Sequence, residues 1–148
     1  MATLTMQRVF DAPPAKVFEF LTQTENLLNW WGPKGTKIRD HSLDFSKVGP
    51  WFAVMVGPNG GVAKVGGDVL EVRAPHAIEL TLRFMMEDGF GPESTIRFEV
   101  SASDTGGTYL LLTQTGLDPE HIDDMMKKGW NAALLRLENL VTLTKNGS

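Results

Sequence analysis

Between residues 36 and 115 the chain alternates short strand-like segments with tight-turn motifs, and no other feature constrains the fold as strongly. The turns include Gly57-Pro58-Asn59-Gly60-Gly61, Ala74-Pro75, and glycine-containing motifs at 88–92 and 104–107. Parallel strands need a connection of roughly a dozen or more residues, so turns of this length predict an antiparallel meander. The expected strands cover residues 36–45, 50–56, 62–73, 76–84, 93–102 and 107–115.

Helices are expected on both sides of this meander. Residues 4–10 alternate apolar and polar side chains as a first strand does, and the proline-containing segment 11–14 ends that strand. Two short amphipathic helices follow before Gly32-Pro33, and Thr24 is the expected N-cap of the second helix. Residues 118–144 then carry apolar side chains at helical spacing, which predicts one long helix of about 25 residues.

This order predicts a single α+β domain over residues 1–148. A seven-stranded, curved antiparallel sheet carries the two short helices and the long C-terminal helix on one face. A strongly curved sheet cannot pack flush against a straight helix along its whole length. The gap between them is either filled by large side chains or left as a cavity for a ligand.

Composition excludes several classes of function. The net charge is −4 and no basic stripe is present, so we expect no nucleic-acid partner. The chain has no cysteine, which excludes disulfides, thiolate nucleophiles and thiolate metal sites. No apolar run approaches the ~20 residues of a membrane span. We find no metal-ligand spacing, cofactor fingerprint or nucleophile motif, so we expect no cofactor, and we expect a cytoplasmic protein.

Several short motifs resemble those of bacterial relatives of the activator of the heat-shock-protein-90 ATPase. They are the Phe10–Pro13 segment, the Trp30–Gly35 segment, the Gly57–Gly61 turn, and two segments of the last helix, Gly129-Trp130-Asn131 and 137–140. The resemblance runs over almost the whole chain in the same order. It implies the helix-grip fold of the START/SRPBCC superfamily, in which the long helix and the sheet enclose a cavity. It implies little about function, because one fold hosts many functions.

Strand parity indicates which side chains face the cavity, because alternate residues of a strand point to the same face. An apolar lining with a few polar groups is typical of a small-molecule site, although the same residues equally make a packed core. The long helix would contribute the lid. The candidate ligand-binding residues are His41, Asp68, Trp51, Met55, Leu82, Phe84, Phe98, Gln114, Met126 and Trp130.

His41 and Asp68 are the polar members of this set that depart from the resemblance. In similar proteins the first position is commonly small or apolar and the second commonly aliphatic. The two side chains could hold a polar ligand group, or act as a base and its orienting partner. A shift of one residue at a bulge would instead place either side chain in solvent.

Three functions are consistent with these observations. The first is non-enzymatic binding of a small apolar or amphipathic molecule, which the absence of catalytic motifs favours. The second is a cyclase or hydratase acting on a polyketide-like substrate through His41 and Asp68, although no residue is assigned as catalytic. The third is an interaction module, co-chaperone-like or homodimeric. Outward parity of Phe52, Tyr109 and Leu111 supports the homodimer.

Overall fold

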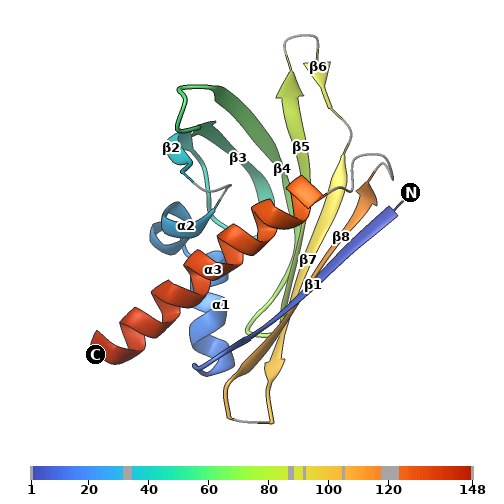
Figure 1. Ribbon diagram of the computed structural model, residues 1–148. Helices are drawn as coiled ribbons and strands as arrows, with labels where there is room; N and C mark the ends of the chain where they lie inside the picture. Colours follow the sequence, from blue (N-terminus) through green and yellow to red (C-terminus); the bar gives the residue numbers. More distant parts are fainter. Residues whose placement is uncertain are drawn as a thin grey trace.

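The computed structural model describes residues 2–31, 35–86, 89–91, 93–104, 106–117 and 124–147. A curved antiparallel sheet wraps around one long helix that lies across its concave face (Figure 1). Two shorter helices cover the same face of the sheet beside the long one. The helices are α1 (Pro14–Thr22), α2 (Thr24–Trp30) and α3 (Asp124–Gly147). The strands are β1 (Ala2–Phe10), β2 (Lys37–His41), β3 (Gly49–Val56), β4 (Val62–Arg73), β5 (Ala77–Met86), β6 (Gly89–Phe90), β7 (Ser94–Ala102) and β8 (Thr108–Leu117).

The sheet has the predicted antiparallel topology. Seven strands follow the order β1-β8-β7-β5-β4-β3-β2, and the two-residue strand β6 pairs with β5 beside this path. Each strand from β2 to β5 pairs with the next one along the chain, as the short turns require. The N-terminal strand β1 closes one edge by pairing with β8. The predicted α+β, helix-grip arrangement is confirmed, and β6 is an addition to it.

Two predicted boundaries differ from the structure around the junction of α1 and α2. The strand expected over residues 36–45 ends at His41. The Ser42 amide still donates to the Phe52 carbonyl of β3 at 2.9 Å, but Leu43 and Phe45 bond to the junction of α1 and α2 instead. Thr24 is the first residue of α2 and not its N-cap, which is Gln23. The Thr24 hydroxyl donates to the Leu43 carbonyl at 2.5 Å, and the Phe45 amide donates to the Thr22 carbonyl at 3.0 Å. These bonds fix the β2–β3 connection against the helices.

The core lies between the concave face of the sheet and the three helices. It is built from the inward-facing residues of each strand and the apolar stripe of α3. From α3 the buried residues are Ala133, Leu134, Leu137 and Val141. No helix in the described part of the chain is long and apolar enough to span a membrane.

Gly129 lies inside α3, where glycine weakens a helix. A Cβ built on Gly129 meets no atom of the described residues within 4 Å outside the helix's own backbone. Glycine inside a helix costs about 0.5–1 kcal/mol relative to alanine, mainly through the entropy of the unfolded chain. We therefore expect Gly129→Ala to raise the unfolding free energy by about 0.5–1 kcal/mol, measured by urea denaturation. A loss of stability would show that this helical turn packs against a neighbour.

Candidate functional site

Six aromatic rings form the centre of the interior. We call Trp30, Trp31, Phe45, Trp51, Phe98 and Trp130 the aromatic cluster. Trp31 joins its members, with ring centroids 5.7 Å from Trp30, 5.3 Å from Phe45, 5.6 Å from Trp51 and 6.2 Å from Trp130. All of these contacts are edge-to-face, the arrangement that aromatic quadrupoles favour. The cluster connects α2, the β2–β3 connection, the sheet and α3.

A relay of hydrogen bonds links α3 to the sheet beside this cluster. The Trp130 indole N–H donates to Gln114 Oε1 at 2.9 Å, and Gln114 Nε2 donates to Ser94 Oγ at 2.9 Å. Ser94 Oγ in turn donates to the Leu82 carbonyl at 3.3 Å. Gln114 and Ser94 are buried, at 5% and 6% exposed. The relay therefore satisfies the polar groups in this part of the interior without a charged side chain.

The indole of Trp51 is anchored on β5, the second strand from β3 in the sheet. Its N–H donates to the Thr81 carbonyl of β5 at 3.1 Å, reaching across β4 opposite Gly67. The Asp68 amide donates to the Thr81 hydroxyl at 2.9 Å. Because Gly67 has no side chain, nothing on β4 blocks the indole. The glycine thus positions one wall of the aromatic cluster.

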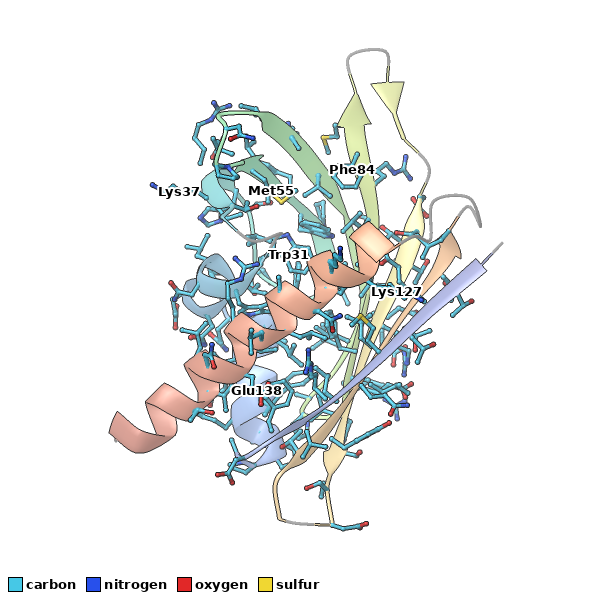
Figure 2. The ribbon with its side chains drawn as sticks, viewed as in Figure 1. Trp31, Lys37, Met55, Phe84, Lys127 and Glu138 are labelled. Carbon is cyan, nitrogen blue, oxygen red and sulfur yellow. The ribbon has the colours of Figure 1, made fainter. Side chains whose placement is uncertain are left out.

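Four side chains form a row across the concave face, beyond the cluster. His41 pairs with Ala53, Ala53 with Val65, and Val65 with Phe84, so all four point to the same face of β2, β3, β4 and β5. We call these four residues the cross-strand row. Ala53 and Val65 are buried, whereas Phe84 is 47% exposed. Three strand spacings separate the ends of the row, about 14 Å. Figure 2 shows Phe84 and Met55 beyond Trp31, toward the end of the sheet that carries β6.

Most candidate residues face the interior as predicted. Trp51, Met55, Phe98 and Gln114 are buried, and Leu82 and Trp130 are partly buried against the core. Phe84 lies on the inward face but keeps half of its surface exposed. The side chain of Met126 lies outside the described residues. Trp30 and Trp31 are both buried.

The inward orientation predicted for Asp68 is wrong. Asp68 is exposed, while its neighbour Val69 is 1% exposed and belongs to the core. The register of β4 against β5 shifts between Val69 and Glu71. The alternation of inward and outward side chains is therefore broken there, and Asp68 does not share the inward face of Val72 as a regular strand would require. Leu70, the residue at this shift, is 50% exposed.

His41 faces in but has no carboxylate partner in Asp68. Its inward orientation follows from its pairing with Ala53, after a register shift between Ile38 and Asp40 that leaves Arg39 exposed. His41 Nδ1 accepts a hydrogen bond from the Leu43 amide at 3.1 Å. Asp68 lies on β4, on the opposite side of β3 from His41, and pairs with Pro50, three residues before the partner of His41. The two side chains therefore do not form the proposed acid–base pair.

Two inward-facing polar residues, one buried and one partly exposed, were not identified from the sequence. Ser94 shares its parity with Ile96 and Phe98, so the strand pattern could have identified it. Arg8 likewise shares the inward parity of Met6 and Phe10, and its Nη2 donates to Asn131 Oδ1 of α3 at 3.1 Å. No group of three potential metal ligands occurs in the part of the chain that the structure describes.

Comparison with known proteins gives one consistent family. The model of the family described as activator of Hsp90 ATPase homolog 1-like protein matches residues 11–142. A crystal structure of a protein of this family from Silicibacter pomeroyi is 32% identical, with a TM-score of 0.90 over 97% of this chain and 99% of that chain. A Staphylococcus epidermidis protein is 25% identical, with a TM-score of 0.79 over 96% of this chain and 90% of that chain. A Chromobacterium violaceum protein, 22% identical, shares the fold with a TM-score of 0.82 over 95% of this chain and 97% of that chain. No curated protein matches the chain significantly.

Proposed function

The chain belongs to the activator of Hsp90 ATPase homolog 1-like family, and on this premise we propose that it binds a small apolar or amphipathic molecule on the concave face of its sheet. The fold of this family commonly holds hydrophobic ligands. The observation that carries the proposal is Phe84, a large apolar side chain that faces inward and is still 47% exposed. Apolar surface left open on an inward face gains free energy when a ligand covers it.

The surroundings of Phe84 favour an apolar ligand. Ala53 and Val65 make a floor of small side chains along the cross-strand row, and Met55 and Leu82 flank it on β3 and β5. The aromatic cluster closes the inner side, because Trp51 lies two residues along β3 from Ala53. Flat aromatic walls and a flexible methionine suit a hydrophobic molecule of variable shape.

The interior also favours an uncharged ligand. The buried polar side chains in the described part of the chain are Thr22, Thr81, Ser94, Thr108 and Gln114, and none of them carries a charge. An ionised group moved among them would lose its hydration without gaining an opposite charge. We therefore expect an apolar body to lie against the row and any charged end to stay in water.

The alternative functions have weaker support. A cyclase or hydratase using His41 with Asp68 is not favoured, because Asp68 is exposed and His41 Nδ1 is already hydrogen-bonded. An interaction module or homodimer stays a hypothesis. Phe52, Tyr109 and Leu111 are only partly exposed, and Lys64 Nζ lies 5.1 Å from the centroid of the Phe52 ring. A cytoplasmic location also stays a prediction.

Truncation of Phe84 tests the proposal directly. We expect Phe84→Ala to weaken binding of the neutral fluorescent probe N-phenyl-1-naphthylamine by roughly tenfold, because the ligand loses apolar contact area. The matched control is Leu70→Ala, which truncates a side chain of similar exposure, 50%, that points to the opposite face of the sheet. Titration of probe fluorescence measures both constants. Equal affinity of the parent protein and Phe84→Ala would contradict the proposal.

A further inference from the structure

His41 on the edge strand β2 presents a hydrogen-bond donor that the described part of the protein does not use. Its Nδ1 accepts a hydrogen bond from the Leu43 amide at 3.1 Å, so Nδ1 carries no proton. The proton of the neutral imidazole therefore lies on Nε2, because a neutral histidine is protonated on one ring nitrogen only. In this tautomer Nε2 is a donor and not an acceptor.

This donor is both unpartnered and accessible. Among the described residues, the His41 side chain makes no hydrogen bond other than the one at Nδ1. Arg8 Nε is the one buried side-chain nitrogen or oxygen without a partner in the same part of the chain. Because Nε2 also lacks a partner and is not such a buried atom, it keeps accessible surface. An incoming acceptor can therefore reach it.

The imidazole ring is held against a segment that is itself fixed. Leu43, whose amide donates to Nδ1, is 1% exposed and belongs to the core. Its carbonyl accepts the hydroxyl of Thr24, the first residue of α2, at 2.5 Å. The two bonds connect the ring to the start of this helix. A donor held in this way loses little conformational freedom when it binds a ligand.

The free donor lies at one end of the cross-strand row, and Phe84 lies at the other. Direct pairing across β2, β3, β4 and β5 places these side chains on the same face of the sheet. Between the two ends, the row consists of Ala53 and Val65, which are apolar and 0% and 1% exposed. The row is therefore an apolar strip about 14 Å long, with one hydrogen-bond donor at its β2 end.

We propose that the ligand of the concave face is an elongated apolar molecule with one neutral carbonyl oxygen, which accepts a hydrogen bond from His41 Nε2. The apolar body extends from this bond across Ala53 and Val65 to Phe84. In the tautomer set by Leu43 the ring carries no charge, so it offers a carboxylate no compensation for its lost hydration. A ligand ammonium finds no acceptor on Nε2. The inference rests on the proposed function, because it names the chemistry of that same ligand.

The test compares two neutral fluorescent probes that differ at one group. The ketone probe is 6-propionyl-2-dimethylaminonaphthalene, and the propyl probe has a methylene in place of its carbonyl. We expect His41→Phe, which keeps a ring of similar size, to weaken binding of the ketone probe by roughly tenfold and to change binding of the propyl probe by less than about twofold. Emission of the bound ketone probe should move to shorter wavelength in this variant, because its carbonyl loses the hydrogen bond. The matched control is His76→Phe in the exposed β4–β5 turn, which should leave both affinities unchanged.

Nitrogen NMR of the parent protein gives a second signature that does not depend on folding of the variant. At mildly alkaline pH, the His41 ring should carry its proton on Nε2, and the Nε2 signal should shift more with the ketone probe than with the propyl probe. A proton on Nδ1, equal Nε2 shifts with the two probes, or equal losses of affinity in His41→Phe would each overturn the inference. If N-phenyl-1-naphthylamine still bound in that case, the proposed function would stand without it. If none of the three probes bound the parent protein, both would fail.

Discussion

The Gly67→Ala variant is expected to be about 3 kcal/mol less stable to unfolding than the parent protein, at the upper end of the usual cost of overpacking. A Cβ at position 67 would lie 2.1 Å from the Thr81 carbonyl oxygen, 2.6 Å from the Thr81 carbonyl carbon and 2.7 Å from Thr81 Oγ1. Two of these atoms belong to the backbone of β5, which cannot rotate out of the way as a flexible side chain could. The strands must therefore separate to accommodate the methyl group.

Separation of the strands has a further consequence for the interior. The same Thr81 carbonyl accepts the Trp51 indole N–H at 3.1 Å, and the Thr81 hydroxyl accepts the Asp68 amide at 2.9 Å. Movement of Thr81 lengthens both bonds and displaces one wall of the aromatic cluster. We therefore expect Gly67→Ala to weaken probe binding on the concave face as well as to lower stability.

Urea unfolding followed by circular dichroism measures the effect on stability. The matched control is Gly61→Ala in the β3–β4 turn, where a Cβ meets nothing within 4 Å among the described residues. We expect the control to change the unfolding free energy by less than about 0.5 kcal/mol, as most surface substitutions do. If the two variants unfolded at the same urea concentration, the close approach of β4 and β5 at Gly67 would be contradicted.

The Trp31→Ala variant is expected to lose about 3–5 kcal/mol of unfolding free energy, the usual cost of truncating a buried tryptophan. Trp31 is 5% exposed and contacts four other rings of the aromatic cluster, at centroid distances of 5.3–6.2 Å. One of these rings is Trp130, so the truncation also removes a contact that holds α3 over the sheet. The near-ultraviolet circular dichroism of the folded variant should weaken, because its aromatic rings are less constrained.

Two control variants separate the effect of lost side-chain volume from the effect of its position in the aromatic cluster. Trp31→Phe keeps an aromatic ring at the same place and should recover a substantial part of the lost stability. Leu28→Ala removes apolar atoms from α2, the helix directly before Trp31, at a side chain that is 39% exposed, and should cost about 1 kcal/mol or less. A Trp31→Ala variant no less stable than Leu28→Ala would show that the aromatic cluster does not organise the core.

Much of the fold could be predicted because its signals are local. Closely spaced turns require antiparallel neighbours. Apolar residues that recur at helical spacing over a long segment predict a single long helix. Parity placed Ile96, Phe98 and Gln114 on the inner face without error, since β7 and β8 pair in continuous register there. In such strands a single buried residue determines the orientation of all the others.

The candidate site was less predictable because its geometry depends on breaks in that regularity. The shift between Val69 and Glu71 turned Asp68 outward, and the shift between Ile38 and Asp40 turned Arg39 outward while His41 faces in. A bulge is set by long-range pairing and leaves no reliable mark in the sequence. The Arg8–Asn131 contact joins residues 123 positions apart, so no local pattern could indicate it.

Native mass spectrometry of the protein, purified gently from its own cells, tests the central claim most directly. The account predicts one small, largely apolar molecule per chain, released and identified on denaturation, and lost from Phe84→Ala under the same purification. The Leu70→Ala control should retain the molecule. A protein that carries no ligand, and whose thermal stability is unchanged by a panel of neutral apolar and aromatic compounds, would contradict ligand binding on the concave face.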